Sequence, residues 1–145
     1  MISVGDARAR ILEAAPAPIT EIVMLAEAAG RTLAAPIVAR RTQPPADMSA
    51  MDGYAVRAED VAKPGATLKV IGAAPAGRPF AGVVGPGETV RIFTGGETPA
   101  GADAVILQED AMADGAKVTF SEAAILGRHI RRGGLDFVAG ESTIP

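Results

Sequence analysis

Two short stretches of the sequence combine residue types that could do chemistry. The first, MSAMDGYAV over residues 48–56, sets the carboxylate of Asp52 between apolar residues and directly before a glycine. An acid at such a turn is commonly a solvated structural residue. The alternative is a carboxylate that is held in place to bind a cation or to position water. For this function we expect Met48, Met51 and Tyr54 to pack beneath Asp52 and fix the loop.

The second stretch, RIFTGGETPAGADAVILQED over residues 91–110, leads from an expected strand directly into Thr94, Gly95 and Gly96. Consecutive glycines let backbone N–H groups converge on an anion, and the threonine hydroxyl would add a further donor. An ordinary Gly-Gly turn explains the same pattern. The segments GAAPAGRP and GVVGPG lack the residues that phosphate-binding motifs require, and we therefore exclude both.

Two charged clusters follow later in the chain. Glu109 and Asp110 could bind a hard cation, although a solvated strand end explains them as well. The planar guanidinium groups of the second cluster suit phosphate or an acidic partner, and salt bridges to neighbouring acids are equally compatible with them. This basic cluster consists of Arg128, His129, Arg131 and Arg132.

Composition excludes several classes of protein. The chain has 145 residues, of which 48% are apolar, and a net charge of −3, which argues against a nucleic-acid binder that relies on a global basic field. The absence of cysteine and the single histidine exclude disulfides, thiolate metal sites and a histidine-rich zinc site. No apolar run approaches the roughly 20 residues that span a bilayer, and the N-terminus lacks a signal-peptide pattern. We therefore expect a cytoplasmic protein without membrane or nucleic-acid partners.

The first third of the chain predicts mixed secondary structure. A helix is expected over residues 3–15, with Ser3 as its N-cap and Asp6 completing a capping box. The β-branched residues 19–24 are compatible with a strand, and residues 25–30 favour a short helix that ends at a glycine. Residues after Pro36 are expected to be extended.

The middle of the chain predicts a β-rich unit over residues 46–127. Its apolar runs are short, rich in β-formers and bounded by Gly, Pro or Asp, which is typical of a small barrel or sandwich. The expected strands are residues 53–56, 67–72, 88–93, 103–108 and 117–120.

Taken together, these stretches resemble the N-terminal part of the MoeA-like molybdopterin molybdenumtransferase family, which includes the gephyrin E domain. The resemblance rests on SAMDGYAVRAED, RIFTGGETPAGADAVILQED and HIRRGGLDFVAGE, in that order, and on LAEAAGRTLAAPIVA before them. It covers nearly the whole chain. One departure is visible: the family commonly reads Arg-Gly-Glu-Asp where this chain has Gly133, Gly134, Leu135 and Asp136. An arginine and a glutamate are therefore replaced, and with them any ion pair or phosphate contact that they would make.

The resemblance implies a mixed, β-rich fold. Residues 1–45 and 128–145 would form an elongated α/β subdomain, into which residues 46–127 are inserted as a small β-barrel-like subdomain. The chain stops at Pro145 without a terminating signal, and we expect it to be cut from a longer protein.

The resemblance also implies an activity. Family members insert molybdenum from molybdate into adenylylated molybdopterin, which releases AMP, and Mg²⁺ is involved, although its ligands are unknown here. Asp52 and Thr94 match positions that line the family's active-site cleft and are the predicted catalytic residues. The predicted substrate-binding residues are Ser49, Met51, Gly53, Gly95, Gly96, Arg131 and Arg132.

The family's oligomeric state implies partners as well. Members are homodimers in which the N-terminal region of one subunit faces a downstream α/β domain of the other. The 145-residue chain alone is therefore expected to be inactive. The competing hypothesis is a non-catalytic scaffold or interaction module related to the gephyrin E domain.

Overall fold

The computed structural model describes residues 2–144 and divides into two compact units, one up to Pro36 and one from Ile37 onward. The fold is mostly β, with a curled half-barrel sheet and little helix, which confirms the predicted mixed, β-rich class. No helix within residues 2–144 is long and apolar enough to cross a membrane.

The first unit contains helix α1 (Val4–Ala14) and the 3-10 helix η1 (Leu25–Glu27). The predicted cap is present, because Ser3 Oγ accepts a hydrogen bond from the Asp6 N–H at 3.1 Å and donates one to the Asp6 carboxylate at 2.8 Å. The predicted short helix is limited to one 3-10 turn. Residues 19–24 form no strand, because no strand of this unit is available to pair with them.

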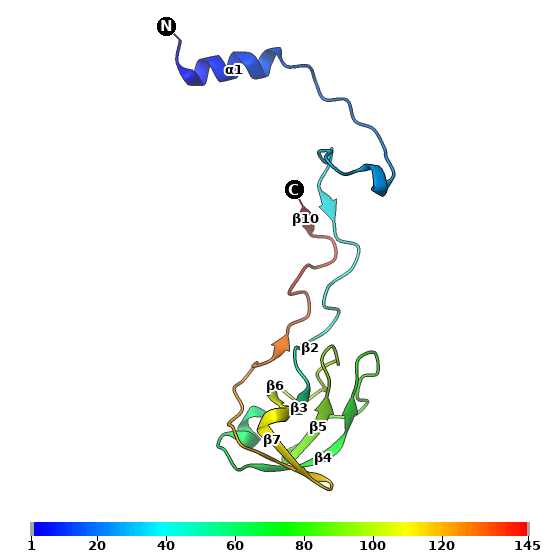
Figure 1. The fold of residues 1–145 in the computed structure, drawn as a ribbon, viewed down its shortest axis with the longest axis vertical. Coiled ribbons are helices and arrows are strands. Elements are labelled where there is room, and N and C mark those ends of the chain that lie inside the picture. Colours follow the sequence, from blue (N-terminus) through cyan, green and yellow to red (C-terminus); the bar gives the residue numbers. More distant parts are fainter. Residues whose placement is uncertain (1, 145) are drawn as a thin grey trace. The chain divides into compact units, whose positions relative to one another are not determined.

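The second unit is built on a six-stranded sheet in the order β6-β3-β5-β4-β8-β7 (Figure 1). Neighbouring strands are antiparallel except β4 and β5, which run parallel. Five of the strands confirm the predicted ones. The sixth, β7, was missed because three of its four residues are exposed and its apolar signal is weak. The strands are β3 (Gly53–Val56), β4 (Thr67–Ala74), β5 (Glu88–Ile92), β6 (Ala104–Leu107), β7 (Ala111–Asp114) and β8 (Lys117–Phe120).

The core lies on both faces of this sheet. All four residues of β3 are buried, and alternate side chains belong to two different apolar clusters. Tyr54 and Phe120 meet edge to face with ring centroids 5.8 Å apart in the first cluster, whereas Ala55 packs in the second. Aliphatic side chains fill most of the remaining core, as the low aromatic content requires. The apolar run of β3 is therefore explained by burial on both of its faces.

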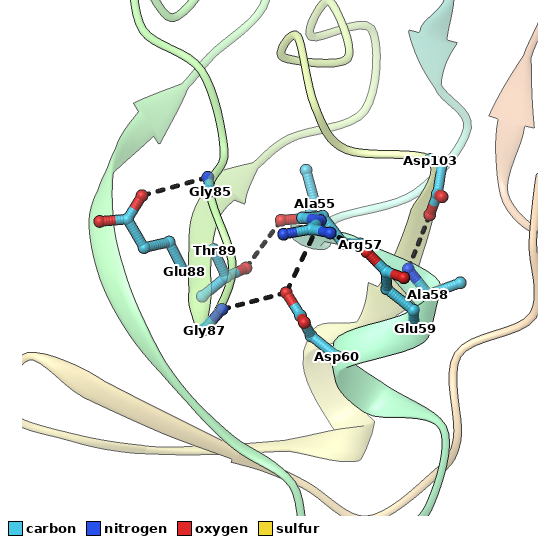
Figure 2. Close-up of polar contacts among 10 residues, drawn as sticks. All are labelled: Ala55, Arg57, Ala58, Glu59, Asp60, Gly85, Gly87, Glu88, Thr89 and Asp103. Carbon is cyan, nitrogen blue, oxygen red and sulfur yellow. Dashed lines mark hydrogen bonds and ion pairs between the residues drawn. The ribbon is translucent and has the colours of Figure 1, made fainter.

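Carboxylates join the loops around the sheet, as Figure 2 shows. The 3-10 helix η2 (Ala58–Val61) carries Asp60, whose carboxylate accepts a hydrogen bond from the Gly87 N–H at 3.0 Å. The Asp103 carboxylate accepts one from the Ala58 N–H at 2.7 Å. Backbone donors that the sheet does not pair are thereby satisfied.

Two short strand pairs connect the segments before and after the sheet. β1 (Ile37–Val38) pairs with β10 (Ser142–Ile144), and β2 (Met48–Ser49) pairs with β9 (Ile130–Arg131), both antiparallel. Gln43 and Phe137 form an isolated bridge between the two pairs. The chain therefore returns beside itself after the sheet. The predicted division into residues 1–45 with 128–145 and residues 46–127 stays a prediction.

Gly53 lies where the backbones of β3 and β6 approach closely. It lies opposite Leu107 in β6, and a Cβ atom at this position would lie 1.9 Å from the backbone oxygen of Ile106. The obstructing atom is a backbone oxygen of the paired strand β6, so it cannot move without disturbing the β3–β6 pairing. Gly53 is therefore required by packing.

We expect Gly53→Ala to lower the free energy of unfolding by about 3 kcal/mol, at the upper end of the cost of overpacking. Gly133→Ala is the matched control, because its new Cβ would be 3.4 Å from the nearest atoms of Ala46 and the residue is exposed. The control should change stability by no more than about 0.5 kcal/mol. Urea denaturation of both variants tests this, and equal stability losses would show that the β3–β6 contact yields easily.

Candidate functional site

Strand β2 brings the three sequence stretches of interest together. The backbone N–H of Ser49 donates to the Gly96 oxygen at 2.8 Å, and the Ser49 oxygen accepts from the Gly95 N–H at 2.9 Å. On its other edge, β2 pairs with β9, which sets Met48 opposite Arg131. Residues from 48–52, 94–98 and 129–133 therefore form one neighbourhood.

The two predicted catalytic residues are in direct contact. One oxygen of the Asp52 carboxylate, Oδ1, accepts hydrogen bonds from the Thr94 backbone N–H at 2.7 Å and from the Thr94 hydroxyl at 2.8 Å. These two bonds, the backbone one first, lower the pKa of the half-buried Asp52 carboxyl, and the positive charge of Arg91 adds to the effect. Asp52 is therefore ionised at neutral pH. Its other oxygen, Oδ2, accepts no hydrogen bond from residues 2–144.

Hydrogen bonds rather than methionines hold this loop. Ser49 is buried, with 2% of its surface exposed, and its hydroxyl donates to the Met51 oxygen at 2.6 Å and accepts from the Met51 N–H at 3.3 Å. Tyr54 is buried as predicted and Met48 is half-buried, but the expected anchoring by Met51 is wrong because its side chain is 42% exposed. Substrate contacts of Ser49 and Met51 stay predictions.

Of the two alternatives for the glycine loop, an anion nest and an ordinary turn, the structure does not form the nest. The Thr94 N–H is bound to Asp52, the Gly95 N–H to the Ser49 oxygen, and the Gly96 N–H to the Phe93 oxygen at 2.7 Å. The hypothesis of converging free donors is therefore wrong, because the loop uses these N–H groups to bind its own surroundings. Gly96 is required for packing, since a Cβ there would lie 2.3 Å from the Ala74 oxygen. Substrate contacts of Gly53, Gly95 and Gly96 by other atoms stay predictions.

The arginines of the basic cluster are ion-paired, in agreement with the salt-bridge alternative. Arg128 pairs with Glu122 at 3.3 Å, and one nitrogen of Arg131 contacts both Asp136 oxygens, at 2.7 and 2.9 Å. Arg132 pairs with Asp47. Both Arg131 and Arg132 remain exposed, and their contact with substrate stays a prediction.

Asp47 connects the loop before β2 to the segment in which this chain departs from the family pattern. Its carboxylate accepts a hydrogen bond from the Gly133 N–H at 2.9 Å and pairs with Arg132. The Gly133 bond is the larger cause that lowers the pKa of Asp47. The replacement at Gly133 therefore keeps a backbone donor, whereas the side chain of Leu135 is exposed.

Sequence analysis missed two residues that contact the Asp52 loop. Arg91 Nη1 donates to the backbone oxygen of Gly53 at 3.0 Å, and the Gln108 N–H donates to the backbone oxygen of Asp52 at 3.1 Å. An arginine three residues before Thr94 was the available signal. Gln108 begins the 3-10 helix η3 (Gln108–Asp110), and no group of three acidic, histidine or cysteine side chains within residues 2–144 could hold a metal ion there or elsewhere.

Two concave surfaces within residues 2–144 lie away from Asp52 and Thr94. A depression of about 400 Å³ is lined by residues of β7, β8 and η3, among them Met112 and Phe120. A cavity of about 10 Å³ adjoins β6 and His129. Neither is lined by Asp52 or Thr94. The candidate site is therefore defined by its hydrogen bonds.

Comparison with known proteins gives one consistent family. The family model described as MoeA N-terminal region (domain I and II) matches residues 2–145. The molybdopterin molybdenumtransferase of Haemophilus influenzae is 41% identical over 143 residues, which cover 97% of this chain and 35% of that protein. The Nostoc sp. molybdopterin molybdenumtransferase is 38% identical over 130 residues, which cover 87% of this chain and 30% of that protein.

The fold is similar to that of solved structures as well. The crystal structure of the molybdopterin biosynthesis MoeA protein from Pyrococcus horikoshii OT3 matches with a TM-score of 0.78 and 38% identity, covering 86% of this chain and 34% of that chain. The chain thus spans about a third of the length of the relatives that it matches.

The Asp52–Thr94 contact predicts a measurable titration. Thr94→Val removes the hydroxyl donor and keeps the backbone N–H, so the pKa of Asp52 should rise but remain below its usual value. A lowered folded-state pKa means that ionised Asp52 stabilises the fold above its ordinary pKa and loses this contribution as pH falls through the folded-state value. As pH falls, Thr94→Val should therefore lose the stabilising contribution of ionised Asp52 at a higher pH than the wild type does.

Carboxyl-carbon NMR of the wild type and the variant measures this change. Asp47 is the internal control, because its partners Gly133 and Arg132 are untouched and its pKa should stay constant. An Asp52 pKa that does not move in Thr94→Val would show that the hydroxyl bond is absent in solution.

Proposed function

Because the chain belongs to the MoeA N-terminal region family, we propose that it forms the N-terminal part of an enzyme of molybdenum cofactor biosynthesis. The proposed reaction inserts molybdenum from molybdate into adenylylated molybdopterin and releases AMP. The names of the relatives support a substrate of this kind, since they are called molybdopterin molybdenumtransferase.

The hydrogen-bond direction at Asp52 carries the proposal for the site. All three N–H groups of residues 94–96 and the Thr94 hydroxyl proton are donated within the protein. What remains at this point is the carboxylate oxygen Oδ2 of Asp52 and the lone pairs of the threonine oxygen. The site therefore offers acceptors, which suit a cation or a donating water better than an oxyanion.

Mg²⁺, which the family resemblance implies, fits these acceptors as an ion that would be bound by both the protein and the substrate. Mg²⁺ in proteins is usually bound by one or two carboxylates together with water and substrate phosphate oxygens. Asp52 provides one such carboxylate. When bound, Mg²⁺ would offset the negative charge of phosphate oxygens. Asp52 would supply the carboxylate, and Thr94 keeps that carboxylate ionised and fixed in direction.

The negatively charged substrates require donors from elsewhere. We assign this role to Arg131 and Arg132, which are exposed and each retain N–H groups beyond those in their ion pairs. Because one guanidinium nitrogen of each already contacts an aspartate, they provide directional donors more than net charge. A homodimer, with the downstream α/β domain of the partner subunit as the second wall, completes the proposal.

We expect Asp52→Ala and Asp52→Asn in the full-length protein to lower molybdenum cofactor formation by about a hundredfold or more. The asparagine keeps an acceptor for Thr94 but replaces the outward oxygen by an NH₂ donor, so it tests the acceptor itself. The assay supplies adenylylated molybdopterin, molybdate and Mg²⁺. Melting temperatures should remain close to that of the wild type.

Asp114→Ala is the matched control, because it removes an exposed carboxylate from β7. It should retain full activity. Wild-type activity in Asp52→Asn would remove the outward oxygen from the mechanism. A full-length wild-type protein without turnover would instead favour the non-catalytic scaffold.

A further inference from the structure

Arg91 crosses the strand that leads out of the Asp52 loop. It lies on β5 opposite Tyr54 of β3, and its guanidinium reaches over β3 to the first residue of η3. Nη1 donates to the Gly53 oxygen at 3.0 Å, and Nη2 donates to the side-chain oxygen of Gln108. One side chain therefore ties together the ends of β3 and β6.

Two aromatic rings fix the orientation of this guanidinium. The Arg91 Cζ atom lies 5.1 Å from the Tyr54 ring centroid and 5.0 Å from the Phe93 ring centroid. Contacts of this kind attract a cation to the ring face and restrict a long side chain that otherwise has many rotamers. Lysine could keep the charge, but its single ammonium group lacks the planar fork that addresses two acceptors.

These contacts converge on the main chain of Asp52. Arg91 binds the side-chain oxygen of Gln108. The backbone N–H of Gln108 in turn donates to the backbone oxygen of Asp52 at 3.1 Å. Arg91 holds the next carbonyl oxygen, that of Gly53. Two successive backbone carbonyls are thus bound by Gln108 and Arg91, whereas Thr94 binds the carboxylate.

We propose that Arg91 is a positioning residue for Asp52 and acts through Gly53 and Gln108. This inference rests on the function proposed above for Asp52. Without the guanidinium, the Gly53 oxygen loses its side-chain donor and Gln108 loses the contact that orients it. The direction of the Asp52 carboxylate then varies, and a misplacement of about 1 Å at a reacting group can cost about a hundredfold in rate.

The test uses Arg91→Met and Arg91→Lys in the full-length protein, with Lys69→Met as the control that removes an exposed charge from β4. Steady-state kinetics give kcat and KM for adenylylated molybdopterin. Amide hydrogen exchange of peptides containing Thr94 and Gln108 reports on the Asp52 loop independently of activity. A peptide covering β8 monitors global unfolding.

For Arg91→Met we expect kcat to fall about ten- to a hundredfold with little change in KM. Exchange at Thr94 and Gln108 should be at least about tenfold faster, whereas exchange in β8 should be unchanged. Arg91→Lys should remain impaired, and Lys69→Met should resemble the wild type. Unchanged exchange at both residues, or full recovery by lysine, would overturn the proposal.

Faster exchange with unchanged kcat would also overturn it, provided that Asp52→Ala is inactive. If Asp52→Ala is itself active, the function proposed for Asp52 fails, and that outcome is recognised separately. Should Arg91→Met not fold, Gln108→Ala decides the question. It removes the acceptor of Arg91 and keeps the backbone N–H, so unchanged kcat and unchanged exchange at Thr94 would contradict the proposal.

Discussion

The backbone of Ser49 is bound on both edges, and the candidate site depends on this constraint. One edge exchanges hydrogen bonds with the glycine loop after β5, and the other pairs with β9. The Ser49 hydroxyl turns back onto the Met51 backbone and is almost fully buried. Three segments that are far apart in the sequence thereby share one short strand. Displacing Ser49 would separate Thr94 from Asp52, and Arg131 of β9 from both.

The same constraint determines which chemistry is available. A loop that uses its N–H groups for its own architecture cannot offer them to a ligand, and the Thr94–Gly96 segment has committed all three. The carboxylate of Asp52 is in the opposite situation, because it receives two donors on one oxygen and none from residues 2–144 on the other. The loop of residues 94–96 therefore provides rigidity, and the Asp52 carboxylate provides the group that is available for chemistry. Such division is the usual arrangement of a held functional group and its supporting residues.

Much of the fold was predictable because burial leaves a periodic record in the sequence. The strands at 53–56, 88–92 and 104–107 are rich in residues that favour β-structure, and the structure pairs the first with each of the other two. β7 and the short strands β2, β9 and β10, of two or three residues each, escaped prediction, since such short segments carry little hydrophobic signal. At the site, residue types pointed to Asp52 and Thr94. Hydrogen-bond direction was not predictable, because whether Gly95 donates to a ligand or to Ser49 depends on contacts distant in sequence.

The paired segments before and after the sheet have an evolutionary consequence. The Ala39 N–H donates to the Glu141 oxygen and the Gly140 N–H to the Ala39 oxygen, both at 2.9 Å, so everything between these residues leaves and re-enters through adjoining backbone. Closing a loop of roughly one hundred residues costs entropy that grows only with the logarithm of its length. A gene segment that encodes a unit with adjacent ends can be inserted into another protein as a block. The insertion needs only two neighbouring backbone positions in the receiving protein, such as those of a paired hairpin.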